Sequence, residues 1–428
     1  MPKKRFVQTY TVALTSHLQQ QILHWLNSYD ICCLLSSNNQ TLPYSQVSFL
    51  AAGGAYKTQE AVHLHAPTIN QFLADEPDWV FGNIAFNTAY ATQPNYAEKH
   101  KLDEFKNLAL FKPEVVVHWQ QNILTIESIQ DNTEAIWQAI QAIVLKDELN
   151  LTSPFQPLVS IQQYKQQFQT IQRHLQQGNC YEINYCIPWQ AQYQQLDIPA
   201  LWHQLVQASP TPFSAFYKWH SQYCVCASPE RFFQLQNDTI ITQPIKGTQK
   251  RGTTTTEDAA LLQELQHSLK NKSENVMIVD LMRNDMSPLC QRGTVHVQEL
   301  FAITAYEQVF QMHSTIQGTL LPHKKLGHVL EALFPMGSMT GAPKKRVLEI
   351  THEVETQQRG LYSGSIGYWN PQGISDWNVV IRSIIINTDT KTASYQVGSG
   401  ITVYSEANEE YEECLLKAKA IQQIWNRL

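Results

Sequence analysis

Apolar positions group along the chain into runs that predict blocks of strands and blocks of helices. Short apolar or alternating runs bounded by Gly, Pro, Asn or Asp are typical of strands, and apolar residues every three or four positions are typical of helices. Strands are expected at 6–14, 31–35, 47–52, 79–90, 114–126, 180–187, 303–318 and 362–400, with a meander of strands over 213–245. Helices are expected at 18–26, 131–144, 161–175, 201–208, 257–270, 273–285, 325–334, 342–353 and from 406 onward. Because strands and helices do not alternate singly, the pattern predicts an α+β fold with antiparallel sheets.

A polar segment over residues 145–157 interrupts this pattern. It contains Asn150, Pro154 and Pro157, which are residue types that favour loops. The chain has 428 residues, enough for two structural regions. We therefore predict an N-terminal region over 1–150 and a second region over 151–428.

Composition and charge narrow the classes of function. Charged residues make up 16% of the chain and the net charge is −6, so no nucleic-acid partner is indicated. No apolar run reaches the length of a membrane-spanning helix, and polar residues after Lys3, Lys4 and Arg5 interrupt any signal-peptide core. The eight cysteines include no Cys-x2-Cys pair, which argues against zinc and favours free, buried thiols in a cytoplasmic protein.

Lys246 is the most informative single residue. It follows the apolar run 239–242 at a Pro- and Gly-containing segment, so it is expected where a strand gives way to a turn. Glu230 lies sixteen residues earlier, in a second turn between strand-like runs. A lone lysine on a turn is usually a solvated surface charge. A lysine near convergent acids, however, is a candidate nucleophile or carboxylate anchor.

Two helices carry further acids at the edge of an apolar face. Ser273 is a plausible N-cap for the first helix, which presents Glu274. On the C-terminal helix, Glu410, Glu413 and Lys417 recur at helical spacing. These acids could simply complement helix N-termini or form surface ion pairs. Carboxylates on two facing helices would also suit Mg²⁺, which leaves positions open for substrate oxygens.

Two Gly-containing turns and one arginine could bind carboxylates. The segment 337–344 fails as a phosphate loop, because Pro343 stands where an amide donor is needed, but it could bind a carboxylate through backbone amides. The segment Gly398 to Gly400 follows a strand and could act likewise. Arg382 is expected inside the apolar strand 379–384, where its partner would be an acid of the sheet or an anionic ligand.

Taken together, these motifs resemble the chorismate-utilising enzymes, the family of aminodeoxychorismate, anthranilate, isochorismate and salicylate synthases. The resemblance covers essentially the whole chain and rests on the segments 228–232, 244–248, 274–285, 337–344, 364–368, 398–401 and 410–417. It implies two antiparallel sheets packed as a sandwich with helices outside. It also implies that residues 151–428 form the chorismate-binding catalytic region.

Lys246 distinguishes members of this family. With a lysine at this position, the chain resembles the aminodeoxychorismate synthases, whereas anthranilate synthases have alanine there. Glu182 stands where the water-using isochorismate and salicylate synthases have a lysine base. The resemblance thus implies formation of 4-amino-4-deoxychorismate from chorismate and ammonia, for 4-aminobenzoate and folate synthesis, with ammonia from a separate glutamine amidotransferase. Anthranilate synthase component I is the alternative enzyme, and a chorismate- or tryptophan-binding regulatory protein is the non-enzyme alternative.

The resemblance also implies roles for individual residues. Glu274 and Glu413 would bind Mg²⁺, with Glu410 near them. Glu230 would be the general acid, and Lys246 the nucleophile, in a neutral form that requires a lowered pKa. Substrate anchors would be Arg382, Tyr362, Ser338, Lys417, Thr248 and the amides of Gly398, Ser399 and Gly400.

Two further positions bear on the resemblance. Gln311 stands where many members have histidine, and His313 is expected on the same face of the strand two residues later. Some members also have a tryptophan pocket, which would use Ser37, Pro212, Phe213, Ser214, Ala215 and Phe216. Core packing is the alternative role for the two phenylalanines.

Overall fold

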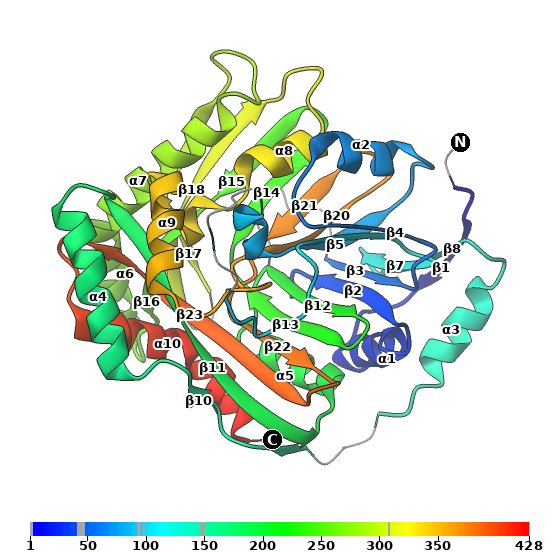
Figure 1. The fold of residues 1–428 in the computed structure, drawn as a ribbon. Coiled ribbons are helices and arrows are strands. Elements are labelled where there is room, and N and C mark those ends of the chain that lie inside the picture. The colour runs from blue at the N-terminus through cyan, green and yellow to red at the C-terminus, as the bar shows by residue number, and fades with distance from the viewer. Residues whose placement is uncertain are drawn as a thin grey trace.

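Two large antiparallel sheets form the centre of the computed structural model, which describes residues 3–40, 48–91, 96, 99–145, 150–306 and 309–427. Helices lie on the outer sides of the sheets (Figure 1). The predicted α+β fold is therefore confirmed. Within the described residues, none of the helices is long and apolar enough to cross a membrane.

The first sheet has thirteen strands among the described residues, in the order β1-β8-β7-β3-β2-β12-β13-β22-β23-β11-β10, with β9 and β19 also paired to β11. Its strands are β1 (Phe6–Thr11), β2 (Ile31–Ser36), β3 (Phe49–Gly53), β7 (Val115–Gln120), β8 (Ile123–Ser128), β9 (Leu151–Thr152), β10 (Gln156–Pro157), β11 (Glu182–Gln195), β12 (Phe213–Trp219), β13 (Gln222–Ser228), β19 (Gly341–Ala342), β22 (Ser383–Asn387) and β23 (Thr392–Thr402). The long strands β11 and β23 pair over eleven residues, from Glu182 opposite Thr402 to Gln192 opposite Thr392.

The second sheet has ten strands among the described residues, in the order β16-β18-β15-β14-β21-β20-β5-β6-β4, with β17 also paired to β18. Its strands are β4 (Lys57–Ala61), β5 (Val80–Ile84), β6 (Leu108–Lys112), β14 (Arg231–Gln236), β15 (Thr239–Gln243), β16 (Ile245–Lys250), β17 (His296–Ala305), β18 (Val309–Thr319), β20 (Ser365–Trp369) and β21 (Ser375–Asn378).

Three hydrophobic clusters define the layers. One cluster lies between the sheets and joins Cys33 and Leu50 of the first sheet to Phe81 and Ile366 of the second. The other two large clusters join each sheet to its outer helices. These helices are α1 (Ser16–Leu26), α2 (Ala66–Ala74), α3 (Thr133–Gln141), α4 (Ile161–Gln176), α5 (Ile198–Ala208), α7 (Leu269–Met286), α8 (Leu326–Leu333), α9 (Lys344–Val354) and α10 (Ala407–Trp425), with short 3-10 turns at η1 (Phe86–Tyr90) and η2 (Gly337–Met339). Helix α6 (Thr255–His267) packs on β18 through a smaller cluster that contains Leu265 and Phe310.

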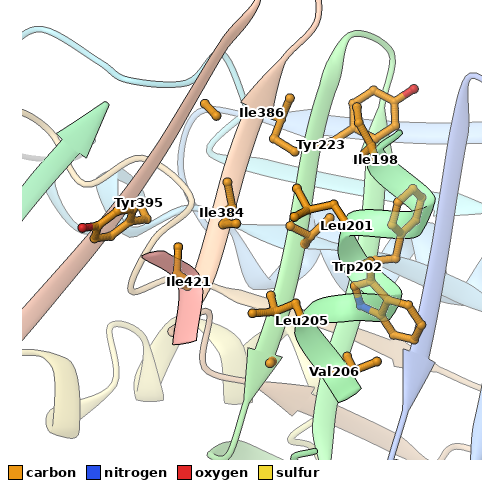
Figure 2. Packing of buried hydrophobic residues seen from close by; sticks show 14 of the residues in the cluster. Ile198, Leu201, Trp202, Leu205, Val206, Tyr223, Ile384, Ile386, Tyr395 and Ile421 are labelled. Atoms are coloured by element: carbon orange, nitrogen blue, oxygen red, sulfur yellow. The ribbon is translucent and has the colours of Figure 1, made fainter. Parts of the chain in front are cut away.

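Helix α5 illustrates how a helix is fixed to a sheet. Asp197 caps its first turn by accepting a hydrogen bond from the Ala200 amide at 3.0 Å. Its apolar face, which includes Leu201 and Leu205, packs toward Ile384 (Figure 2). The spacing of these apolar residues is the helical period that predicted this element.

The two halves of the sequence are interleaved in space. Strand β2 pairs with β12 in the first sheet, and β5 pairs with β20 in the second. Residues 146–149, beside the predicted boundary at residue 150, lie outside the described residues, as does Val47 at the start of an expected strand. The division at residue 150 stays a prediction about the sequence.

Two local expectations were wrong. The strand expected over 79–90 ends at Ile84, and residues 86–90 form η1, in which the Thr88 hydroxyl donates to two backbone carbonyls. Helix α7 begins at Leu269, with Ser268 as its N-cap in place of Ser273. Because Ser268 accepts a hydrogen bond from the Asn271 amide, the helix gains a turn before Glu274.

Candidate active site

Lys246 projects from an irregular part of β16 into the interior. The register of β16 against β18 shifts between Ile245 and Thr248, and Gly247 has a φ of +98°. Such bulges re-aim side chains and commonly include a glycine at positive φ. The expected turn at Lys246 was therefore wrong, because the glycine introduces a bulge within the strand and does not end it.

The Lys246 ammonium bridges the two sheets. Its Nζ donates a hydrogen bond to Oε1 of Glu182, the first residue of β11 in the other sheet. Burial disfavours the ammonium, but the charges of Glu182, Glu274 and Glu230 outweigh it and raise the pKa of Lys246. The lowered pKa expected for this lysine was therefore wrong: in the unliganded protein the amine is protonated.

Glu230 lies near the same lysine, in the turn between β13 and β14. Its side chain is buried, and its backbone amide donates to the Ser228 hydroxyl at 3.2 Å. Burial raises the pKa of Glu230 to about 7, against the lowering effects of a hydrogen bond from Ser338 and of the Lys246 charge. A carboxyl group with this pKa can hold a proton at neutral pH and release it during a reaction.

Glu274 of α7 is an incompletely paired carboxylate. Its Oε1 is buried and has no hydrogen-bond partner among the described residues. Burial raises the pKa of Glu274 to about 7, while Lys246 opposes that shift. A buried acid in this state is suited to a cation that the protein itself does not supply.

The two glutamates of α10 already have partners. Lys270 donates to Glu410 at 3.1 Å, and Lys417 pairs with Glu413 at 2.7 Å. The described residues contain no group of three or more His, Cys, Asp or Glu side chains arranged for a metal ion. The carboxylates fit a hard cation at Glu274, and Glu413 could join it if its ion pair with Lys417 opens.

Strand β23 brings small residues to the same place. A Cβ at Gly400 would lie 2.9 Å from Glu182 Oε1 and 3.2 Å from Lys246 Nζ, so a side chain there would press on the ion pair. Lys417 donates to the Gly398 carbonyl at 2.8 Å. The Ser399 side chain lies on the opposite face of the strand, near Tyr164 and Cys414, so only its amide could serve as an anchor.

The remaining expected anchors occupy different settings. Ser338 contacts Glu230. Tyr362 is buried beside Cys186, which follows Glu182 by four positions on β11. Thr248 is exposed and lies opposite Gln311 in the β16–β18 ladder.

Arg382 was expected inside a strand, and this was wrong. It has a φ of +50° and immediately precedes β22, because the segment between β21 and β22 turns from one sheet to the other. The Arg382 carbonyl accepts a hydrogen bond from the Ala227 amide at 3.1 Å, and the guanidinium charge opposes the rise in the pKa of Tyr306 that burial causes.

Gln311 and His313 lie on the middle of β18. The Gln311 side chain is buried, with Oε1 unpaired among the described residues. His313 lies 3.8 Å from Glu299, and burial lowers its pKa. The histidine therefore belongs to a pair at the β17 side of the strand.

Four of the six residues expected at a tryptophan pocket line a separate hollow between the sheets. The hollow is lined by Leu35, Ser36, Ser37, Pro212, Phe213, Ser214, Ile366, Tyr368, Asp376 and Asn378. Ala215 and Phe216 do not line it: Ala215 packs between the sheets, and Phe216 packs on the outer, helix-covered side of the first sheet. Alternation along β12 explains this split.

Sequence reasoning missed two charged residues that hold the site together. Lys270, the partner of Glu410, precedes Glu274 by four residues on α7, so helical spacing could have indicated it. Arg359 is fully buried and donates hydrogen bonds to the carbonyls of Asn184 and Met339, both at 2.7 Å. The sequence shows Glu355 four residues before Arg359, but it does not reveal that Arg359 also bonds these two carbonyls, which lie farther away in the chain.

Comparison with known proteins identifies the family to which the chain belongs. A family model for chorismate binding enzymes matches residues 30–423. Aminodeoxychorismate synthase component 1 of Salmonella typhimurium is 36% identical over 316 residues, covering 73% of this chain and 69% of that protein. The Escherichia coli component 1 is 34% identical over 333 residues, covering 78% and 73%.

Longer relatives and solved structures extend the comparison. A probable chloroplastic aminodeoxychorismate synthase of Oryza sativa is 38% identical over 275 residues, which cover 62% of this chain but 30% of that protein. This chain thus spans less than a third of the plant relative. Anthranilate synthase component I of Streptococcus pneumoniae has the same fold, with a TM-score of 0.74 at 22% identity over 90% of this chain and 93% of that one. So does the menaquinone-specific isochorismate synthase of Escherichia coli, with a TM-score of 0.77 at 17% identity over 99% and 95%. The expected sandwich is confirmed, and the chain belongs to the family of chorismate binding enzymes.

Proposed function

We propose that this chain forms 4-amino-4-deoxychorismate from chorismate and ammonia, for 4-aminobenzoate and folate synthesis. The observation that supports this most strongly is Lys246, a buried lysine among acids at the junction of the two sheets. Chorismate as substrate is supported by the family, and amination at C4 by relatives named aminodeoxychorismate synthase at 34–38% identity.

The residues divide the chemistry among them. The neutral amine of Lys246 would form a bond to C2 of chorismate as the two conjugated ring double bonds shift and the C4–oxygen bond breaks. Glu230 would give its proton to that oxygen, which leaves as water. Ammonia would then bond to C4 as the two double bonds shift back and the C2–nitrogen bond breaks, which frees Lys246. The new C4 ammonium would lose one proton, which restores Glu230. Lys417, Ser338, Tyr362 and Arg382 would hold the two substrate carboxylates, together with the amides of Gly398 to Gly400.

Mg²⁺ is part of the proposal. Glu274, with its unpaired oxygen, and Glu413 would hold it, and Glu410 would support them through Lys270. When bound, the ion would hold the ring carboxylate and stabilise negative charge near the departing hydroxyl.

We also propose the partners and the compartment. Ammonia would come from a glutamine amidotransferase, because the bacterial relatives are named component 1, which implies a second component. The hollow lined by Ser37 and Phe213 would accept tryptophan. All eight cysteines are free and buried, which supports a reducing compartment such as the cytoplasm.

Product identification tests this proposal. The purified chain is incubated with chorismate, Mg²⁺ and ammonia, and the products are analysed by mass spectrometry. An amino-substituted chorismate that keeps the enolpyruvyl group, and that a lyase converts to 4-aminobenzoate, is the expected result. Anthranilate with released pyruvate would contradict the choice based on Lys246. Absence of turnover, even with an amidotransferase partner, would favour a binding protein.

A further inference from the structure

The protonated state of Lys246 leaves a step unexplained in the proposed reaction. An ammonium has no free electron pair, so it must lose a proton before it can bond to carbon. The side chain is buried, which limits access of solvent water as the acceptor. The acceptor therefore has to be a group of the protein or of the substrate that reaches Nζ.

Glu182 is the group in direct contact with that nitrogen. In the described part of the chain, it is the one hydrogen-bond partner of Lys246 Nζ. The Glu182 side chain is 1% exposed, and its second oxygen, Oε2, is buried without a partner. The Glu182 carboxylate thus contacts the proton to be moved and has an unpaired oxygen that can hold it.

The neighbouring backbone preserves this contact. Glu182 is fixed at the start of β11, which pairs with β23 on one side and with β19 at Gly341 and Ala342 on the other. Gly400 packs closely against the ion pair: a Cβ there would lie 2.9 Å from Glu182 Oε1 and 3.2 Å from Lys246 Nζ, so a larger residue would displace one of these atoms. The glycine therefore allows the contact between Glu182 and Lys246 to form.

We propose that Glu182 is a catalytic base that takes the proton from Lys246 when substrate is bound. The inference rests on the proposed function above. One N–H bond of the ammonium breaks and one O–H bond forms on Glu182, which leaves a neutral amine and a neutral carboxylic acid. The nitrogen electron pair then bonds to C2. After ammonia has displaced the amine, Glu182 returns its proton to Lys246 and the resting ion pair is restored.

The other charged groups facing Lys246 are less suited to this role. From the β13–β14 turn, Glu230 contacts Ser338 and would protonate the leaving hydroxyl. From α7, Glu274 influences Lys246 electrostatically but forms no ion pair with it, and Lys270 is bound to Glu410. From α10, Glu413 and Lys417 are paired to each other. Glu182 alone among these described groups combines contact with an unpaired oxygen.

The test compares the wild type with Glu182→Gln across a pH series, using saturating ammonia and Mg²⁺. The amide preserves the size of the side chain but cannot accept the proton, so aminodeoxychorismate formation near pH 7 should fall by about 100-fold or more. Lys246 would then lose its proton to solvent, so the ratio of variant to wild-type rate should rise with pH, by up to tenfold per unit. If the role of Glu182 were purely structural, the rate of the variant would be lower than that of the wild type by the same factor at every pH.

Control variants distinguish failure of the role proposed for Glu182 from failure of the proposed function. Glu127 of β8 lies away from the Lys246 cluster and is a half-buried glutamate bonded to Trp79 and His118. Glu127→Gln should therefore leave the rate and its pH dependence unchanged. If Glu182→Gln does not fold, Glu182→Ala is assayed with added formate, and a rate that rises with formate concentration supports the base.

Three results would overturn the inference: a parallel pH profile, retention of activity within threefold, or no response of Glu182→Ala to formate. In each case a wild type that still makes aminodeoxychorismate leaves the proposed function intact. A wild type that makes none rejects the proposed function itself.

Discussion

Two buried charged clusters flank β11, and they differ in how completely their polar atoms are paired. In the first, Lys246 contacts Glu182 while Glu182 Oε2 and Glu274 Oε1 have no partner among the described residues. In the second, Arg359 and Glu355 pair at 2.7 Å, and every guanidinium nitrogen of Arg359 donates a hydrogen bond. Glu355 also accepts from the Cys186 amide at 3.0 Å.

This difference is our reason for proposing a structural role for the Arg359 cluster and a functional role for the Lys246 cluster. A buried charge is tolerated when its hydrogen bonds are made, and each unpaired buried polar atom lowers stability. The Arg359 cluster joins β11 to the carbonyl of Met339 and so fixes Ser338, beside Glu230, relative to Glu182. The Lys246 cluster has carboxylate oxygens without hydrogen-bond partners among the described residues. A site for an anionic substrate and a cation requires such unpaired polar atoms.

The largest effect on stability is expected from Arg359→Met. Removing the guanidinium leaves the Glu355 carboxylate buried and unpaired, so the free energy of unfolding should fall by about 3–5 kcal/mol. Denaturant unfolding followed by circular dichroism measures this. Arg283→Met, which breaks an exposed pair with Asp280, is the control and should change stability by less than about 1 kcal/mol. Equal effects of the two variants would remove the distinction between the clusters.

Glu230→Gln should give the next largest effect, on rate. Loss of a general acid typically lowers the rate by about 10²–10⁴-fold. Because burial raises the pKa of Glu230 to about 7, the wild-type rate should be full below pH 7 and fall as the group ionises above it. The variant should lack that alkaline limb. A wild-type rate that climbs steadily from pH 6 to pH 9 would exclude Glu230 as the acid.

Glu274→Gln should stabilise the protein at alkaline pH. The folded-state pKa of Glu274 is about 7, above the ordinary 4.5, so ionisation lowers stability as pH rises from 4.5 to 7. The full cost above pH 7 is about 3 kcal/mol. Unfolding in the presence of a chelator should therefore show a gain of about 1–3 kcal/mol at pH 8 and almost none at pH 4.5. A loss of stability at pH 8 would mean that Glu274 is well paired after all.

Gly400→Ala should give the smallest loss of rate among these active-site variants. The new methyl group would press on Glu182 Oε1 and Lys246 Nζ, at a cost of about 1–3 kcal/mol from overpacking. Aminodeoxychorismate formation should fall about tenfold or more, because small displacements of reacting groups strongly reduce rate. Ser394→Ala on the same strand, away from this pair, should retain its rate. Unchanged activity of Gly400→Ala would show that the close packing of β23 against the ion pair does not matter for the reaction.

The sequence predicted much of the fold, and the reasons differ between elements. Periodicity identified α4 and α10, since their apolar faces pack on a sheet and follow the helical period. It misplaced Lys246 and Arg382, because a bulge at Gly247 and a positive φ at Arg382 depend on which strands pair. It could not show that Glu182 meets Lys246, since β11 and β16 belong to different sheets and only the packing of the sheets joins them.

Residues of the candidate site could be identified from the sequence only where a motif or helical spacing indicated them. Glu230 and Glu274 were identified from their motifs, and the structure places both beside Lys246. Arg359 could not be recognised, because its role arises from carbonyls of Asn184 and Met339, far away in sequence. A hydrogen bond to a backbone carbonyl does not depend on the side chain of the partner residue, so the sequence does not indicate it.

The most direct test of the central claim is ammonia-dependent turnover of chorismate by Lys246→Ala, measured beside the wild type with both proteins shown to be folded by circular dichroism. If the Lys246 cluster is the active site and Lys246 its nucleophile, formation of aminodeoxychorismate should fall by about 1,000-fold or more. Turnover within tenfold of the wild type would contradict the account, because the reaction would then proceed without the residue around which the cluster is built.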